Sequence, residues 1–85
     1  MATATPSPTP NPNAMRFALD VTLPGTVTAS SPEQAAGDAF VGALLAIDGV
    51  VSVFGTGTFV TVTRRPGADW EPIIPAVQEA AAAHL

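Results

Sequence analysis

Residues 50–65 read VVSVFGTGTFVTVTRR, and this stretch predicts a β-hairpin. Apolar and polar side chains alternate with period two on both sides of Gly55-Thr56-Gly57, as they do in strands with one buried face. Glycines supply the positive φ that a tight hairpin turn requires. We therefore expect strands over residues 50–54 and 58–64, joined by a turn whose central pair is either Gly55-Thr56 or Thr56-Gly57.

The two faces of this hairpin differ in chemistry, because side chains two apart along a strand share a face. In either register one face is aliphatic and is expected to face the core; it holds Val51, Val53, Val60 and Val62. The opposite face holds Ser52, Phe54, Phe59, Thr61 and Thr63. Two phenylalanines among small hydroxyl side chains predict an apolar patch on that face.

A helix is expected before the hairpin. Ser31 can cap its N-terminus, Pro32 suits its first position and Gln34 completes a capping box. Apolar residues then recur at three- and four-residue spacing as far as Ile47, which predicts one buried stripe. Gly49 is a typical C-terminal stop.

Elements on either side complete the expected set. Residues 15–21 alternate apolar with other side chains and predict a strand, and residues 26–29 predict a short second strand. Asp69 is a suitable cap for a last helix. Pro75 conflicts with a helix interior, because it removes one hydrogen bond and clashes with the preceding turn. A short turn at 69–73, followed by a helix from about Pro75, is therefore expected.

These elements predict an α+β fold, a two-layer sandwich of order ββαββα. A mostly antiparallel four-stranded sheet would hold both helices on one face, since each helix has one apolar stripe to bury. Residues 1–12, rich in proline, threonine and alanine, are expected to form a flexible arm, and residues 13–85 a single domain. The expected core consists of Phe17, Leu19, Phe40, Leu44, Ile47, Val51, Val53, Val60, Val62, Trp70 and Val77.

Composition excludes several kinds of chemistry. The 85 residues include no cysteine, so the chain offers no thiol nucleophile and no thiolate ligand for zinc or an iron–sulfur cluster. Three basic residues against seven acidic ones give a net charge of -4, which argues against nucleic acid or an anionic membrane as partner. Residues 39–62 carry a single charge, Asp48, and are long enough for a membrane span, but Asp48 near their middle, the glycines and the period-two alternation argue against one. A cytoplasmic location is expected.

Four stretches of the chain form a recognisable series. They are TPNPNAMRF at residues 9–17, ALLAIDGV at 43–50, the hairpin pieces VFG and FVTVT at 53–55 and 59–63, and Trp70 with Ile74 and Pro75. Together they resemble the N-terminal domain of Nfu/NifU-type iron–sulfur scaffold proteins, from about residue 9 to the C-terminus. Thr58, where that family usually has an acidic residue, and Arg64, in place of its usual lysine, depart from the pattern.

The resemblance implies an accessory domain without the cysteine-bearing cluster domain of full scaffold proteins. It implies a non-catalytic protein-interaction module associated with iron–sulfur cluster assembly or delivery, which itself binds no cluster, other cofactor or metal. The implied partner is a cysteine-bearing scaffold domain or an apo iron–sulfur recipient. A small homodimeric adaptor unrelated to iron–sulfur biology is the alternative. An enzyme is disfavoured, because the carboxylates are scattered and neither a second histidine nor a base for a serine is present.

The candidate partner-binding residues fall in two groups. Phe54, Phe59 and Thr61 lie on the outer face of the hairpin, with Arg64 and Arg65 placed to flank them. This face either is exposed for a protein contact or is covered by the N-terminal segment or a loop. The second group is Asn11 and Asn13, which border Pro12. This motif is either a rigid lead-in that sets the register of the first strand, which we favour, or a partner-facing loop.

Overall fold

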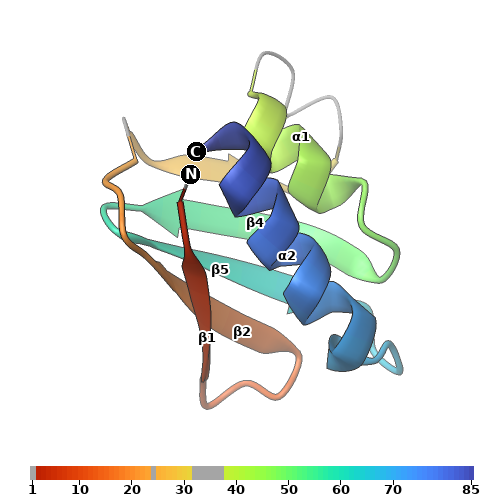
Figure 1. Cartoon of the computed structure of the whole chain (residues 1–85). Helices are drawn as coiled ribbons and strands as arrows, with labels where there is room; N and C mark the ends of the chain where they lie inside the picture. The colour runs from red at the N-terminus through yellow and green to blue at the C-terminus, as the bar shows by residue number, and fades with distance from the viewer. Residues whose placement is uncertain (1, 24, 32–37) are drawn as a thin grey trace.

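Two helices cover one face of a single antiparallel sheet in the computed structural model, which describes residues 2–23, 25–31 and 38–85 (Figure 1). The strands are β1 (Ala4–Pro8), β2 (Ala14–Leu19), β3 (Val27–Ala29), β4 (Val50–Thr56) and β5 (Phe59–Arg64). The helices are α1 (Ala39–Leu45) and α2 (Trp70–His84). The strand order is β1-β2-β5-β4-β3. The predicted two-layer α+β architecture is confirmed, with five strands in the described residues instead of four.

The additional strand is β1, which lies where a flexible arm was expected. It pairs with β2 in a register that places Ala4 opposite Leu19, and Ala2 and Ala4 are buried. Gln78 of α2 donates a hydrogen bond to the Ala4 carbonyl at 3.1 Å. Because β1 is an edge strand, its prolines remove no hydrogen bond from the interior of the sheet. The prediction of a flexible arm is therefore wrong for residues 4–8.

The β4–β5 hairpin is confirmed, but its turn lies later than either expected pair. Thr56 pairs with Phe59, so Gly57 and Thr58 form the turn. Gly57 has a φ of 58°, and no described residue other than glycine has a positive φ. In a type II′ turn the first central residue has a positive φ and is typically glycine, and the second has a negative φ. Gly57 and Thr58 fit these two positions. Gly55 belongs to β4 and is buried, where a Cβ would lie 2.9 Å from Leu23 Cδ1.

A β-bulge in β4 reverses the expected orientation of Val51. Val50 pairs with Arg64 and Ser52 pairs with Thr63, so Val51 is an extra residue without an opposite partner. Val51 is 40% exposed, whereas Val50 packs against the core. The prediction of Val51 as a core residue is wrong, because strict alternation does not hold across the bulge.

The rest of the expected core lies between the sheet and the helices. Leu19 and Phe40 are buried, and six of the expected residues are 2% exposed or less: Phe17, Leu44, Val53, Val60, Val62 and Val77. Ile47 and Trp70 pack against this core and are partly buried. Leu23, Ile73 and Ala81 are also buried but were not on the predicted list.

Helix α1 begins at Ala39, and its N-cap residue is Asp38 and not the expected Ser31. The Asp38 carboxylate accepts a hydrogen bond from the Val41 amide at 3.0 Å, which is a typical N-cap contact. Pro32 and Gln34, which the sequence analysis placed at the start of this helix, lie outside the described residues. Gly49 has a φ of 96° in the connection from α1 to β4.

Helix α2 is continuous, so the expected break before Pro75 is wrong. It runs from Trp70 to His84 with Asp69 at the N-cap position. Pro75 is exposed, whereas Ile73, Val77 and Ala81 recur every four residues and are buried. The burial of this stripe offsets the one backbone hydrogen bond that Pro75 cannot donate.

Candidate functional site

The face of the sheet opposite the helices is polar, with a small aromatic centre. The registers place Ser7, Arg16, Thr61, Phe54 and Thr28 in one row across all five strands. Phe59 lies in the neighbouring row, between Ala18 and Thr56. These side chains alternate along each strand with the buried ones, so they point away from the core. We call Arg16, Phe54, Phe59 and Thr61 the outer-face cluster.

The two phenylalanines of the outer-face cluster form a tilted pair. Their ring centroids are 6.3 Å apart with an interplanar angle of 47°, a favourable aromatic geometry. Phe54 is 41% exposed, and Phe59 is half-buried. The N-terminal segment lies beside β2 as a strand and leaves Phe54 accessible. Thr61 stands between Phe54 and Arg16 in the row, so the structure brings together three of the predicted residues, Phe54, Phe59 and Thr61.

Arg16 is the cationic residue that the sequence analysis missed. Its guanidinium carbon lies 4.1 Å from the centroid of the Phe59 ring, within the range of a cation–π contact. Its position between Met15 and Phe17 already indicated an outward side chain. The contact with Phe59, however, depends on the pairing of β2 with β5, which brings together residues 43 positions apart in the chain.

Arg64 does not flank the outer-face cluster, contrary to the sequence-based prediction. It follows Thr63 on β5 and therefore points to the helix side of the sheet. Its Nη1 donates to the Ala68 carbonyl at 2.7 Å and its Nε to Asn13 Oδ1 at 3.4 Å. Its guanidinium carbon lies 5.2 Å from the Trp70 ring centroid. Arg64 thus joins β5, the β1–β2 loop and the start of α2.

Asn11 and Asn13 shape that same β1–β2 loop. Asn11 Oδ1 accepts from the Asn13 amide at 2.9 Å, and the Asn13 carbonyl accepts from the Arg64 amide at 2.7 Å. Trp70 Nε1 donates to the Pro12 carbonyl at 3.2 Å. These contacts fix the loop against β5 and α2, as expected for a rigid lead-in to β2. They also place the two asparagines apart from the phenylalanine pair.

Arg65 lies apart from the outer-face cluster and from the contacts that Arg64 makes with the β1–β2 loop. Its Nη2 is 3.9 Å from Asp48 Oδ1, and both side chains are largely exposed. Such a surface ion pair contributes little to stability. The predicted site residues therefore lie in three places. Phe54, Phe59 and Thr61 belong to the outer-face cluster. Arg64, Asn11 and Asn13 lie where the β1–β2 loop meets β5 and α2, and Arg65 lies on the exposed surface.

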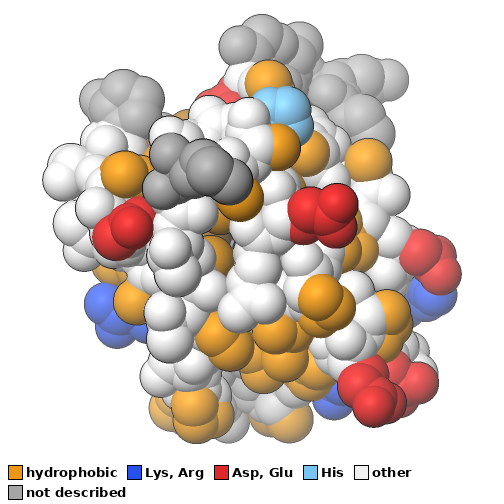
Figure 2. Space-filling model, viewed as in Figure 1, with side chains coloured by type: hydrophobic (Ala, Val, Ile, Leu, Met, Phe, Trp, Pro, Cys, Tyr) orange, Lys and Arg blue, Asp and Glu red, His pale blue; other side chains and the backbone are white. Residues whose placement is uncertain are grey.

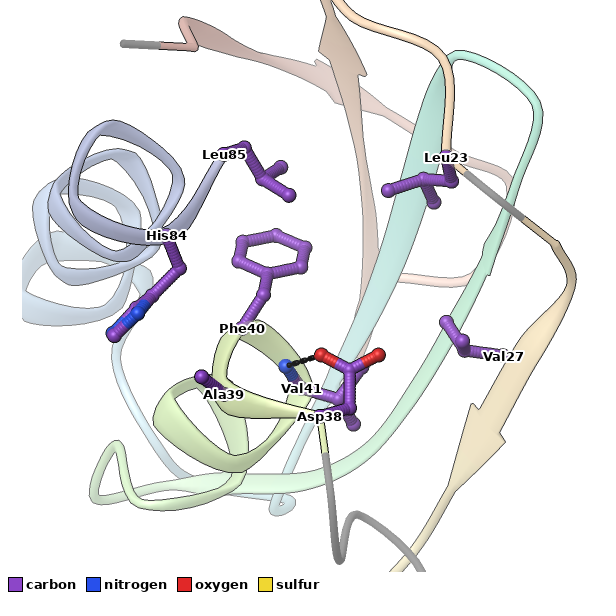
Figure 3. Close-up of a pocket in the computed structure, with 8 residues that line it drawn as sticks. All are labelled: Leu23, Val27, Asp38, Ala39, Phe40, Val41, His84 and Leu85. Carbon is purple, nitrogen blue, oxygen red and sulfur yellow. Dashed lines mark hydrogen bonds between the residues drawn. The ribbon is translucent and has the colours of Figure 1, made fainter.

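A hollow of about 240 Å³ lies near the start of α1 and the end of α2 (Figure 3). Phe40 and Leu85 line one side, and Leu23 and Val27 line the other. The carboxylate of Asp38 is engaged with the Val41 amide, and among the described residues that line the hollow no second polar side chain converges on the exposed His84. Three or more His, Cys, Asp or Glu side chains do not gather anywhere in the described ranges. None of the helices described is both long and apolar enough to cross a bilayer.

Comparison with known proteins shows relatives in staphylococci. Conserved virulence factor C of Staphylococcus aureus strain MRSA252 is 44% identical over 41 residues, which cover 48% of this chain and 11% of that protein. The same factor from Staphylococcus haemolyticus strain JCSC1435 is 42% identical over 38 residues, covering 45% of this chain and 10% of that protein. The chain thus matches about a tenth of the length of these curated relatives.

Solved structures and a family match cover nearly the whole chain. The crystal structure of protein SAV1430 from Staphylococcus aureus has a TM-score of 0.79 and 29% identity, over 94% of this chain and 98% of that one. The solution structure of SeR13 from Staphylococcus epidermidis has a TM-score of 0.64 and 25% identity, over 98% of both chains. Residues 5–85 match the family described as "Scaffold protein Nfu/NifU N terminal". The resemblance found in the sequence is therefore confirmed, and the chain belongs to the Nfu/NifU N-terminal family.

Proposed function

We propose that this chain is a non-catalytic protein-interaction module that acts in iron–sulfur cluster assembly or delivery and binds no cluster itself. The family match over residues 5–85 supports the association with scaffold proteins. The chain has no cysteine to supply the thiolates that usually hold a cluster, so in this proposal the cluster is held outside these 85 residues. In this proposal the module docks a cysteine-bearing scaffold domain or an apo iron–sulfur recipient.

The observation that most supports docking is the exposed aromatic pair in the outer-face cluster. Phe54 keeps 41% of its surface exposed although its strand, β4, is paired on both sides, with β5 and β3. Aromatic residues are enriched in protein interfaces, where they provide much of the binding energy. The surrounding threonines and serines can form the polar rim that such interfaces have.

Binding of the purified chain to a cysteine-bearing Nfu-type scaffold domain and to an apo iron–sulfur recipient tests the proposal. We expect one of them to form a complex, and we expect the complex to weaken in the Phe54→Ser, Phe59→Ser double variant while the circular dichroism spectrum stays unchanged. Binding that the double variant leaves unaltered contradicts docking through this face. A collapsed spectrum would instead show that the rings are needed for folding, and the Phe54→Ser single variant then tests binding alone.

A second experiment tests whether the cluster belongs to the partner. After incubation with iron and sulfide under reducing, anaerobic conditions, the isolated chain is expected to show no visible-range cluster absorbance. The cysteine-bearing scaffold domain, treated in the same way, is the positive control. A stable cluster spectrum on the isolated chain contradicts the proposal.

A further inference from the structure

The outer face of the sheet has a distinctive charge distribution. Of the side chains that β1 to β5 place on this face, Arg16 alone is charged, and the others are phenylalanine, threonine, serine, alanine and the bulged Val51. Within the described ranges Arg16 has no acidic partner, since the ion pair found there joins Arg65 to Asp48. Its positive charge is thus available beside the Phe59 ring.

The described acidic residues lie outside the strands. Asp20, which directly follows β2, is the one nearest in sequence to the outer-face cluster, and its Oδ1 accepts a hydrogen bond from the Thr3 amide at 2.8 Å. The chain has a net charge of -4, and none of its described carboxylates belongs to a strand. Figure 2 views the helix side and shows acidic side chains spread over it; Glu71 and Glu79 are exposed on α2. A negatively charged partner is therefore repelled from the helix side and attracted to the outer face, because complementary charges steer association.

We propose that the outer-face cluster binds an acidic segment of a partner protein, in which a carboxylate stands beside an aromatic or aliphatic side chain. This inference rests on the proposed docking role of the same face. The carboxylate would pair with the free side of the Arg16 guanidinium, whose other side covers Phe59 at 4.1 Å. The apolar side chain would pack on the Phe54–Phe59 pair, burying the exposed part of Phe54.

The spacing of these groups suits an extended segment. The two ring centroids are 6.3 Å apart, and the guanidinium lies next to the nearer ring. Residues i and i+2 of a strand are about 7 Å apart and point to the same side. A carboxylate two residues from an apolar side chain can thus reach Arg16 and the ring pair together.

A second copy of this chain fits the same surface less well. In a symmetric dimer each copy would present the same patch to the other. Two outer-face clusters would bring two Arg16 charges into one interface without a carboxylate from any strand. Burying unpaired like charges is costly, which favours a chemically different, acidic partner.

The test uses a displayed library of random linear peptides, selected on the whole chain. We expect selected peptides to contain an aspartate or glutamate two residues from an aromatic or aliphatic residue. Added to the labelled chain, they should shift the amide resonances of Arg16, Phe54 and Phe59. Arg16→Glu should weaken binding about tenfold or more, and replacing the peptide carboxylate with lysine should restore binding to this variant. Arg65→Glu is the matched control, because it makes the same charge change away from the cluster.

Several outcomes overturn the inference. These are selected peptides without acidic residues, no selected peptide at all, resonance shifts confined to the helices, or an Arg65→Glu effect as large as that of Arg16→Glu. A concentration-dependent dimer that Phe54→Ser abolishes would show that the occupant is a second copy. If an iron–sulfur scaffold binds through Phe54 but ignores the charge of Arg16, the inference fails and the proposed function stands. If acidic peptides bind as expected but no iron–sulfur protein does, the proposed function fails.

Discussion

The guanidinium of Arg64 lies over the indole ring of Trp70, with 5.2 Å between the guanidinium carbon and the ring centroid. The same guanidinium donates to the Ala68 carbonyl at 2.7 Å, and Trp70 donates to the Pro12 carbonyl at 3.2 Å. Arg64 and Trp70 therefore hold together three segments that are distant in sequence: the β1–β2 loop, the end of β5 and the start of α2.

Arg64→Lys is expected to lower the free energy of unfolding by about 1–2 kcal/mol. Lysine keeps the charge but lacks the planar fork that contacts Ala68, Asn13 and Trp70 at once. The midpoint of urea unfolding measures the change. Arg65→Lys is the control, because its exposed side chain makes one long ion pair, and its midpoint should stay near that of the parent chain. If Arg64→Lys and Arg65→Lys change the urea midpoint equally, the contacts of the Arg64 guanidinium do not stabilise the fold as proposed.

Gly49→Ala is expected to destabilise the protein by about 2 kcal/mol or more. Gly49 has a φ of 96°, and its added Cβ would lie 3.1 Å from Ala68 Cβ and 3.3 Å from Ile73 Cδ1. Gly67→Ala is a matched control, since Gly67 has a φ of 89° but nothing within 4 Å of the added atom. It should cost about 1 kcal/mol, from backbone strain alone. The unfolding temperatures of the two variants separate the steric contact with Ala68 and Ile73 from the backbone strain. If both variants lower the unfolding temperature by the same amount, the steric contact at Gly49 contributes nothing.

Val53→Thr is expected to cost about 1–2 kcal/mol, whereas Val51→Thr should leave stability within about 0.5 kcal/mol of the parent. Val53 is 2% exposed, so the hydroxyl that threonine introduces there would be buried. The bulge leaves Val51 at 40% exposure, where the added hydroxyl can contact water. Urea unfolding of the two variants checks the bulge directly, because the same chemical change is made two positions apart. A larger loss for Val51→Thr would mean that β4 keeps strict alternation.

Removal of residues 2–8 is expected to lower the free energy of unfolding by about 2 kcal/mol or more, since it removes strand β1 and the buried Ala2 and Ala4. Gln78 would also lose its bond to the Ala4 carbonyl. The unfolding midpoint and amide exchange of β2 report the change, because β2 becomes an edge strand. Ser7→Ala, an exposed change on β1, is the control and should be silent. An unchanged midpoint after truncation would support the flexible arm that composition alone predicts.

Local patterns in the sequence were reliable where they involved neighbouring residues. The alternation of residues 50–65 correctly predicted the hairpin and placed Phe54 and Phe59 on its outer face. The break expected before Pro75 was wrong, but the four-residue spacing of Ile73, Val77 and Ala81 is the pattern of the continuous helix that the structure shows. These features depend on backbone periods that a short stretch of chain defines by itself.

Contacts between distant segments could not be predicted in this way. Composition suggested a flexible arm, but the open edge of β2 gives residues 4–8 a partner, and pairing there buries Ala4. Likewise, two adjacent arginines were assigned to the phenylalanine patch. The pleat of β5 turns Arg64 to the helix side, and the pairing of β2 with β5 brings Arg16 to Phe59 instead.

The sequence by itself therefore determined the fold class, the family, the hairpin and the aromatic pair, because each follows from local periodicity or from motifs read in order along the chain. Only the tertiary structure decided the β1 edge strand, the bulge at Val51 and the choice of Arg16 as the cation beside Phe59. The physical reason is register. Which residues of two distant strands face each other depends on how the whole sheet buries its apolar side, and one extra residue in a strand changes the face of every side chain beyond it.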